Sequence, residues 1–368
     1  MFLVCSYSRM SPASPTKGRG AQSGAASRRF NLPQREADGD WRDVEETVDG
    51  PVDKLRTTVT EEHPATILSF NRSPDIPFDR SINAYRGCEH GCIYCFARPT
   101  HAFHDLSPGL DFETKLFAKP GAADLLRRAL AKPGYKPAPI AMGTNTDPYQ
   151  PIEGRYRITR SILEVCLETR HPAIITTKSD RVLRDLDLLE EMARRRLIHV
   201  GISVTSLDPR LSRLLEPRAA SPAKRLAALG TLAGAGVPVH VGVAPVIPSI
   251  TDHFMEAILA QAAGRGVSSA SFIIVRLPHE VTPLFREWLA VHFPDRADKV
   301  MAIIRSIRRG RDNDPNFGTR MKPQGVWADL FRQRFRLTAR RLGMDRGDLA
   351  LDCSHFRPPD LHGQLRLL

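Results

Sequence analysis

Three of the six cysteines in this 368-residue sequence lie within eight residues, at Cys88, Cys92 and Cys95. Their spacing is C-x3-C-x2-C, in the segment RGCEHGCIYCFARP (86–99). Three thiolates at this spacing can hold three corners of an iron–sulfur cube, which leaves one iron without a protein ligand. That iron could bind and reduce a substrate or a cofactor. Cysteines are otherwise sparse, which argues against a disulfide scaffold.

Two other uses of these thiols remain open on the residues alone. A zinc site would need a fourth ligand, which His90 or His101 could supply, but the sequence has no second cysteine pair and lacks zinc-finger spacing. A cluster used only for electron transfer normally has four cysteines. Three unrelated buried cysteines are not expected at this spacing, with Gly87 and Gly91 in the same loop.

The segment NAYRGCEHGCIYCFAR (83–98) resembles the cluster loop of the radical S-adenosylmethionine (SAM) superfamily, in the branch that includes spore photoproduct lyase. The resemblance covers about residues 65–290, and residues 202–252 are similar to the fourth and fifth strands of that branch with the helix between them. It implies a [4Fe–4S] cluster whose open iron is chelated by the amino and carboxylate groups of SAM. It also implies reductive cleavage of SAM to a 5′-deoxyadenosyl radical, which abstracts hydrogen from the substrate.

The resemblance also implies which residues hold the cofactor. Tyr94 occupies the position of an aromatic residue near the adenine. Thr144 and Asn145, in GTNTDPYQPIE (143–153) after the second strand, take the position that contacts the methionine amino group. Lys178, ending the third strand, could pair with the SAM carboxylate, and Ser203, on the fourth strand, could bond the ribose or carboxylate. Loop packing, a strand-capping lysine and hydroxyls bonded to backbone are the structural alternatives for these residues.

Charged residues after the fourth strand are expected to be structural rather than catalytic. The segment LLEPRAA contains Glu216 and Arg218, which could form an ion pair that shapes the site or could contact the substrate. Arg225 opens the next predicted helix.

The sequence departs from spore photoproduct lyase at a position that matters for its reaction. The resemblance implies a hydrogen-donor cysteine near the end of the second strand, and the corresponding residues 141–150 contain none. Tyr149 lies nearby, and a radical on its side chain is a speculative substitute. Repair of spore DNA is therefore not expected, and the substrate stays unidentified, with DNA or RNA as a hypothesis. An electron donor such as flavodoxin or ferredoxin is the expected partner.

Alternating helices and short apolar strands must position these residues. The helices show apolar residues at i, i+3 and i+4, and the strands are nearly continuous apolar runs, as in a parallel sheet buried on both faces. Serial βα units predict a parallel α/β sheet with right-handed crossovers. Six strands favour a partial (β/α)6 TIM-like barrel of the radical SAM type, with an open doubly wound sheet as the alternative. The expected strands are about 80–86, 139–145, 172–178, 198–206, 238–248 and 270–278; the helices are 122–131, 157–170, 181–196, 221–236 and 253–266.

The chain is expected to divide into a disordered N-terminal tail (1–62), a radical SAM core (63–285) and a helical basic C-terminal extension (286–368). Residues 296–346 carry fourteen basic and five acidic side chains, within a formal net charge of +12. Such a surface could attract nucleic acid, although an arginine-rich solvated face is the simpler interpretation. The charge keeps open an alternative function, a non-catalytic iron–sulfur protein that binds nucleic acid.

The sequence gives no sign of a membrane span or a secretory signal. No apolar run approaches the roughly 18 residues of a membrane helix. The apolar run at the start is too short for the core of a signal peptide. We therefore expect a cytoplasmic protein without a membrane partner.

Overall fold

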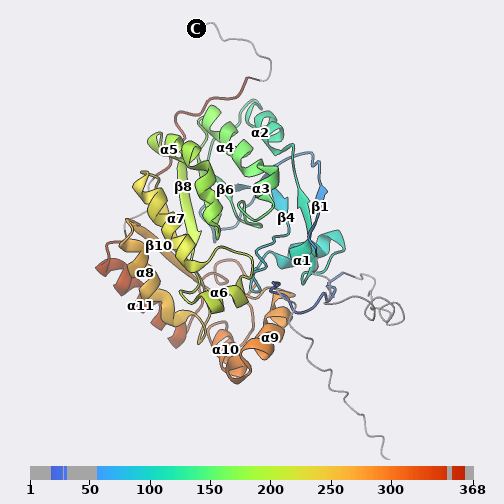
Figure 1. Cartoon of the computed structure of the whole chain (residues 1–368), viewed down its shortest axis with the longest axis vertical. Helices are drawn as coiled ribbons and strands as arrows, with labels where there is room; N and C mark the ends of the chain where they lie inside the picture. The colour runs from blue at the N-terminus through green and yellow to red at the C-terminus, as the bar shows by residue number, and fades with distance from the viewer. Residues whose placement is uncertain (1–17, 28, 31–55, 346–349, 361–368) are drawn as a thin grey trace, which may run out of the picture.

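The computed structural model describes residues 18–27, 29–30, 56–345 and 350–360, and its centre is a seven-stranded sheet (Figure 1). The strands lie in the order β10-β9-β8-β7-β6-β3-β2; β2 is antiparallel to β3 and the other six are parallel. A doubly wound sheet would reverse its strand order at a switch point. This order has no reversal, so the partial (β/α)6 barrel is confirmed. The strands are β2 (Leu68–Phe70), β3 (Arg80–Ile82), β6 (Ile140–Met142), β7 (Ala173–Thr177), β8 (Ile198–Ser203), β9 (Val239–Val246) and β10 (Ser269–Ile274).

Helices between the strands cover the outside of the sheet (Figure 1). Strand residues alternate between this covered face and the barrel interior: Ile175 and Thr177 of β7 are buried, whereas Thr176 between them is exposed. The predicted helix 181–196 is divided, because a 3-10 turn capped by the Ser179 side chain precedes α5. The outer helices are α2 (Ala122–Leu130), α4 (Ile158–Glu168), α5 (Leu186–Arg194), α7 (Pro222–Gly234) and α8 (Met255–Ala263). Shorter ones are η2 (Arg98–His104), α1 (Asp111–Thr114), α3 (Glu153–Tyr156), η3 (Asp180–Asp185), α6 (Pro209–Leu215) and η4 (Asp252–Phe254).

A second, three-stranded sheet was not predicted from the sequence. It has the order β1-β5-β4, with bounds β1 (Thr58–Glu61), β4 (Tyr85–Arg86) and β5 (Lys115–Ala118). β1 lies inside the segment 1–62 that was expected to be a disordered tail, and residues 19–22 of that segment are buried. The tail prediction is therefore wrong for these two stretches. Residues 1–17, 28 and 31–55 lie outside the described residues.

Three helices follow the barrel, as predicted for the C-terminal extension: α9 (Val281–His292), α10 (Pro294–Ser306) and α11 (Val326–Arg341). The proposed domain boundary at residue 285 falls within α9. α11 packs beside α8 and β10, where the rings of Phe335 and Phe272 lie 4.8 Å apart. Within the described residues, no helix is long and apolar enough to cross a membrane.

The open side of the barrel and its amino-terminal end are also covered by this extension. Arg308 donates to the carbonyl of Val275 just after β10 (2.7 Å), and Arg320 pairs with Asp75 in the loop between β2 and β3 (2.6 Å). The segment after α10 thus links the two edges of the sheet. Residues 350–360 cross the amino-terminal end of the strands, where the ring of Phe356 lies 5.5 Å from that of His171.

His171, which precedes β7, is expected to make the fold sensitive to mild acid. The imidazole is fully buried, its Nε2 lies 2.9 Å from the Tyr135 hydroxyl, and burial lowers its pKa to about 4. Between pH 6.5 and 4 the unfolded chain takes up a proton that the folded chain does not, so the free energy of unfolding falls as the pH falls. We expect urea unfolding to show a loss of about 2 kcal/mol from this group between pH 7 and pH 5. The comparison is between the metal-free original protein and metal-free His171→Gln. Between pH 7 and pH 5 the variant should lose less free energy of unfolding, by about 2 kcal/mol. An equal loss in both proteins would contradict the prediction.

Candidate active site

The three cysteines lie in a loop that follows β4 at the carboxyl end of the barrel strands. Cys88 and Cys92 are buried and Cys95 is partly buried. The loop turns at Gly87, whose φ is 71°, and a Cβ there would lie 2.6 Å from the Leu116 side chain. Only glycine therefore fits this turn without displacing its neighbours.

The three thiols share one buried environment. Burial raises the pKa of each of the three thiols. The charges of the neighbouring cysteines raise the pKa of Cys88 and Cys92 further. Bound iron cations would offset the cost of ionising these buried thiols, because metal binding favours the thiolate form. Among residues 18–27, 29–30, 56–345 and 350–360, no group of His, Cys, Asp or Glu side chains could hold a single metal ion. Each thiolate of a cluster binds a different iron, so the trio fits a cluster without converging on one point.

Tyr94 and Lys178 lie together beside Cys92. The Lys178 Nζ is 5.8 Å from the centroid of the Tyr94 ring. Its positive charge acts to lower the pKa of both Cys92 and Cys95, against the larger effect of burial. The Tyr94 hydroxyl donates to the buried carboxylate of Glu216 and lies 3.3 Å from the Thr205 hydroxyl. The loop and the end of β7 thus bring an aromatic ring and a cation to one edge of the cysteine trio.

Glu216 pairs with Arg225 and not with Arg218, which was the ion pair that the sequence left open. Glu216 and Arg225 are almost completely buried and form an ion pair, while Arg218 pairs with Glu89 at 3.0 Å. Arg225 also donates to the carbonyls of Ala220 (2.7 Å) and Ser203 (3.1 Å). Burial opposes ionisation of Glu216, but Arg225 and Lys178 outweigh it and lower its pKa. Glu216 accepts a hydrogen bond from the Tyr94 hydroxyl and is paired with Arg225, so these two residues support Tyr94. The structural role expected for Arg218 stays a prediction.

Thr144 and Asn145 lie at the carboxyl end of β6, both bonded to Asn83 at the end of β3. Asn83 Oδ1 accepts a hydrogen bond from the Asn145 backbone (2.9 Å), and its amide nitrogen is 3.2 Å from the Thr144 hydroxyl. The next residue, Thr146, donates its hydroxyl to the carbonyl of Gly87 (2.7 Å). The β6 loop is therefore tied directly to the cysteine loop.

Asp147 holds the same two loops and β7 together. Its carboxylate accepts hydrogen bonds from the Thr177 hydroxyl (2.7 Å) and the Lys178 backbone (2.8 Å), and it lies 3.3 Å from His90 Nδ1. Although burial alone would raise its pKa, His90 and these hydrogen bonds bring it down to about 2. The carboxylate thereby fixes the strand end that carries Lys178.

Ser203 lies at the end of a barrel strand, whereas the Tyr149 hydroxyl lies in the outer helix layer. Ser203 is buried at the end of β8, and its carbonyl accepts a hydrogen bond from Arg225. The hydroxyl of the fully buried Tyr149 donates to Asp185 at 2.9 Å, just before α5 in the outer helix layer. The structure therefore does not bring this hydroxyl to the cysteine loop, and a radical role for Tyr149 gains no support from its contacts.

Two residues that matter for the cysteine loop were missed in the sequence. Arg98, which follows the third cysteine by three positions, is completely buried and donates to the carbonyl of Cys92 at 2.9 Å. It pairs with Glu113, also completely buried, at 2.5 Å. The only signal was the place of the arginine within the cysteine segment, and a charged residue there suggests an exposed position.

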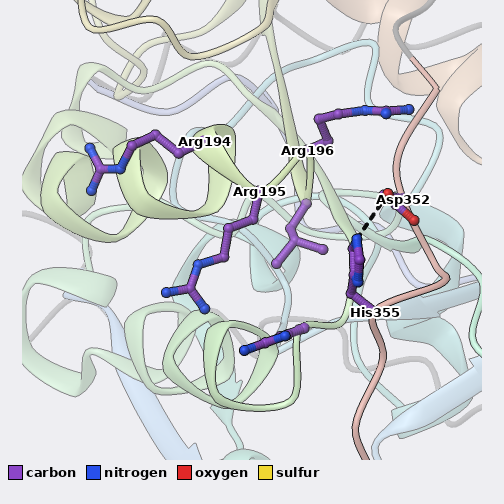
Figure 2. Close-up of a pocket in the computed structure, with 7 residues that line it drawn as sticks. Arg194, Arg195, Arg196, Asp352 and His355 are labelled. Atoms are coloured by element: carbon purple, nitrogen blue, oxygen red, sulfur yellow. Dashed lines mark ion pairs between the residues drawn. The ribbon is translucent and has the colours of Figure 1, made fainter.

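A cavity of about 400 Å³ lies at the opposite end of the barrel (Figure 2). It is lined by Arg170, Arg194, Arg195, Arg196, Leu197, Asp352 and His355. Figure 2 shows the Arg194 and Arg196 side chains extending in opposite directions, so the arginines do not converge on one ligand. Arg194 and Arg195 both pair with Glu191. This cavity is separate from the cysteine end, where the chemistry is expected.

Comparison with known proteins places this site in a family. The family model described as the radical SAM superfamily matches residues 82–262, from β3 through most of α8. A protein of Mycobacterium tuberculosis (strain ATCC 25618 / H37Rv) is 36% identical over 254 residues, which are 68% of this chain and 74% of that protein. The chain belongs to the radical SAM superfamily. The matched region contains the cysteine loop, the last residue of β3 and four complete parallel strands, β6 to β9.

Two further matches are more distant. A protein of Methanocaldococcus jannaschii is 32% identical over 171 residues, 46% of this chain and 61% of that protein. A variant of spore photoproduct lyase has a similar fold, with a TM-score of 0.51 and 18% sequence identity over 81% of this chain and 84% of the other. This second likeness is one of fold alone.

Proposed function

We propose that this radical SAM protein is an enzyme that binds a [4Fe–4S] cluster through Cys88, Cys92 and Cys95 and cleaves SAM reductively. The observation that carries the proposal is the buried trio of thiols at the carboxyl end of a parallel partial barrel, with Tyr94 and Lys178 beside it. When bound, the cluster and SAM together supply a 5′-deoxyadenosyl radical that takes a hydrogen atom from the substrate.

The chain's own residues would bind and orient SAM. The Lys178 ammonium would pair with the carboxylate of SAM, and the Tyr94 ring beside it would contact the adenine. Thr144 and Asn145 are partly exposed at the end of β6 and would bind the methionine amino group. Ser203 lies at the end of β8, where its hydroxyl could reach the ribose or the carboxylate.

The surface near the cysteine loop favours a nucleic acid as the substrate. Phe96 is 53% exposed and Phe103 is 67% exposed, and Arg29 lies 5.8 Å from the Phe103 ring. Exposed aromatic rings stack on nucleic acid bases, and Arg29 beside Phe103 is already paired with Glu280, so the aromatic rings are the main support for this substrate class. Spore photoproduct lyase, which has a similar fold, has been described with a dinucleoside spore photoproduct. An electron donor such as flavodoxin or ferredoxin would reduce the cluster.

Anaerobic reconstitution with iron and sulfide tests this proposal against its alternatives. We expect a brown protein with about four irons per chain that forms 5′-deoxyadenosine from SAM when dithionite is added. With DNA or RNA deuterated in the sugar and base, deuterium should appear in the 5′-deoxyadenosine.

The outcomes separate the candidate functions. Zinc without acid-labile sulfide would overturn the proposal in favour of a zinc site. A cluster that binds nucleic acid in a salt-sensitive way without cleaving SAM would favour the non-catalytic alternative. Formation of 5′-deoxyadenosine without deuterium transfer from either nucleic acid would reject only the proposed substrate class.

A further inference from the structure

Arg98 is buried within the cysteine loop and holds the loop's own backbone. Its Nε donates to the carbonyl of Cys92 (2.9 Å), and its Nη2 donates to the carbonyl of Gly91 (3.1 Å). Its Nη1 donates to the carbonyls of Pro108 (3.1 Å) and Gly109 (2.9 Å), across the turn before α1. With the bond to Glu113, Arg98 makes five hydrogen bonds, as many as the N–H donors of a guanidinium group.

Both oxygens of the partner carboxylate of Glu113 accept hydrogen bonds, and the other two donors come from the far N-terminal part of the chain. Gly20 donates its backbone N–H to Glu113 Oε2 (3.0 Å), and Ala21 donates to Oε1 (2.8 Å). Arg19 donates to the Glu113 carbonyl (2.9 Å). Glu113 therefore joins the cysteine loop to a segment more than ninety residues away in sequence.

That segment, residues 18–27 and 29–30, is called here the N-terminal strap, and it lies between α1 and α9 (Figure 1). Its path touches the cysteine loop closely: a Cβ on Gly20 would lie 1.8 Å from the Gly91 carbonyl oxygen. Farther along, Ser23 donates to Glu287 of α9 (2.9 Å), and Arg29 pairs with Glu280 (2.7 Å). The first residues of the strap thus contact the cysteine loop and Glu113, and its later residues bind Glu287 and Glu280.

The Arg98–Glu113 ion pair holds the cysteine loop through directed hydrogen bonds and not only through packing. A buried charge pair is stable only when its geometry and remaining hydrogen bonds are satisfied, and this pair meets both conditions. Two of the carbonyls that Arg98 binds belong to Gly91 and Cys92, so the arginine holds the backbone at the second cysteine. A cluster-binding loop needs its ligands held in place by groups that do not touch the metal.

We propose that Arg98 and Glu113 are positioning residues that hold the cysteine loop in its cluster-binding conformation, and that the N-terminal strap locks this pair by donating to Glu113. The inference rests on the proposed function for its consequence, a cluster that is retained for longer. The loop-holding itself belongs to the metal-free chain and can be measured there.

The test compares Gly20→Ala with Gly24→Ala in the full chain. An added Cβ at Gly20 collides with the Gly91 carbonyl, whereas a Cβ at Gly24 meets nothing within 4 Å, which makes it a matched control on the same strap. Glu113→Gln removes the charge of the pair while keeping the side-chain shape, and Glu168→Gln is its control at the exposed pair with Arg127.

Hydrogen exchange of the cysteine loop in the metal-free protein is the first measurement. Losing hydrogen bonds to a buried charged group should speed loop exchange roughly 10- to 100-fold in Gly20→Ala and Glu113→Gln. Exchange in the strands of the main sheet and in both control variants should match the original protein. Unchanged loop exchange in Gly20→Ala would overturn the role of the strap even if Glu113→Gln failed to fold.

Loss of the cluster to an iron chelator, followed by visible absorbance, is the second measurement. We expect the chelation half-time to shorten by a similar factor in the two test variants and to stay unchanged in the controls. Equal half-times in all proteins would overturn the link to cluster retention. If the original protein takes up no cluster, the proposed function fails. The hydrogen-exchange data would still decide whether Arg98, Glu113 and the N-terminal strap hold the cysteine loop.

Discussion

Replacing Cys92 with alanine is expected to abolish 5′-deoxyadenosine formation and to remove most bound iron and sulfide. Cys92 is the middle cysteine of the trio, and burial and the charges of Glu216 and Cys95 raise its pKa, so a bound metal is what would keep it as a thiolate. With two thiolates left, two irons of a cube would lack protein ligands instead of one. Iron, acid-labile sulfide and product should be measured together after anaerobic reconstitution.

Cys353→Ala is the matched control for this experiment. Cys353 is partly buried in the C-terminal segment that crosses the amino-terminal end of the barrel, away from the cysteine loop. Its removal should leave iron content and product formation at the level of the original protein. Equal iron and product in Cys92→Ala would show that the trio is not the cluster site.

The barrel and the cysteine site could be predicted because their signals are local in the sequence. The cysteine spacing lies within eight residues, and each strand and helix has its own apolar pattern. The strand order then follows from the rule that successive βα units lie side by side. The roles of Lys178 and Tyr94 were expected from the family resemblance, and in the structure the Lys178 ammonium lies 5.8 Å from the centroid of the Tyr94 ring.

The N-terminal strap could not be predicted, because its contacts carry no apolar periodicity. Gly20 and Ala21 reach Glu113 through backbone N–H groups, which every residue except proline possesses. A polar, glycine-containing segment of this kind has the composition of a disordered tail. Arg98 was missed for a related reason: arginine is usually exposed, and only the structure shows that five acceptors surround it.

The ion pair of Glu216 and Arg225 should be the most sensitive point for the stability of the site. Neither side chain is more than 2% exposed, and Glu216 also accepts hydrogen bonds from Tyr94 and Thr205. Arg225→Met would leave the Glu216 carboxylate buried without its main cation, which costs about 3–5 kcal/mol. Chemical denaturation of the metal-free protein should show this loss, whereas Arg127→Met, at an exposed pair, should lose less than about 1 kcal/mol.

A double variant separates the pair from the packing around it. Replacing both members, as Glu216→Gln with Arg225→Met, removes the uncompensated charge, so the loss should be smaller than the sum of the two single losses by about 1–3 kcal/mol. Tyr94 keeps an acceptor in the glutamine variant but loses the charged one. Strictly additive losses would mean that the two charges do not stabilise each other, and that Tyr94 is held by packing instead.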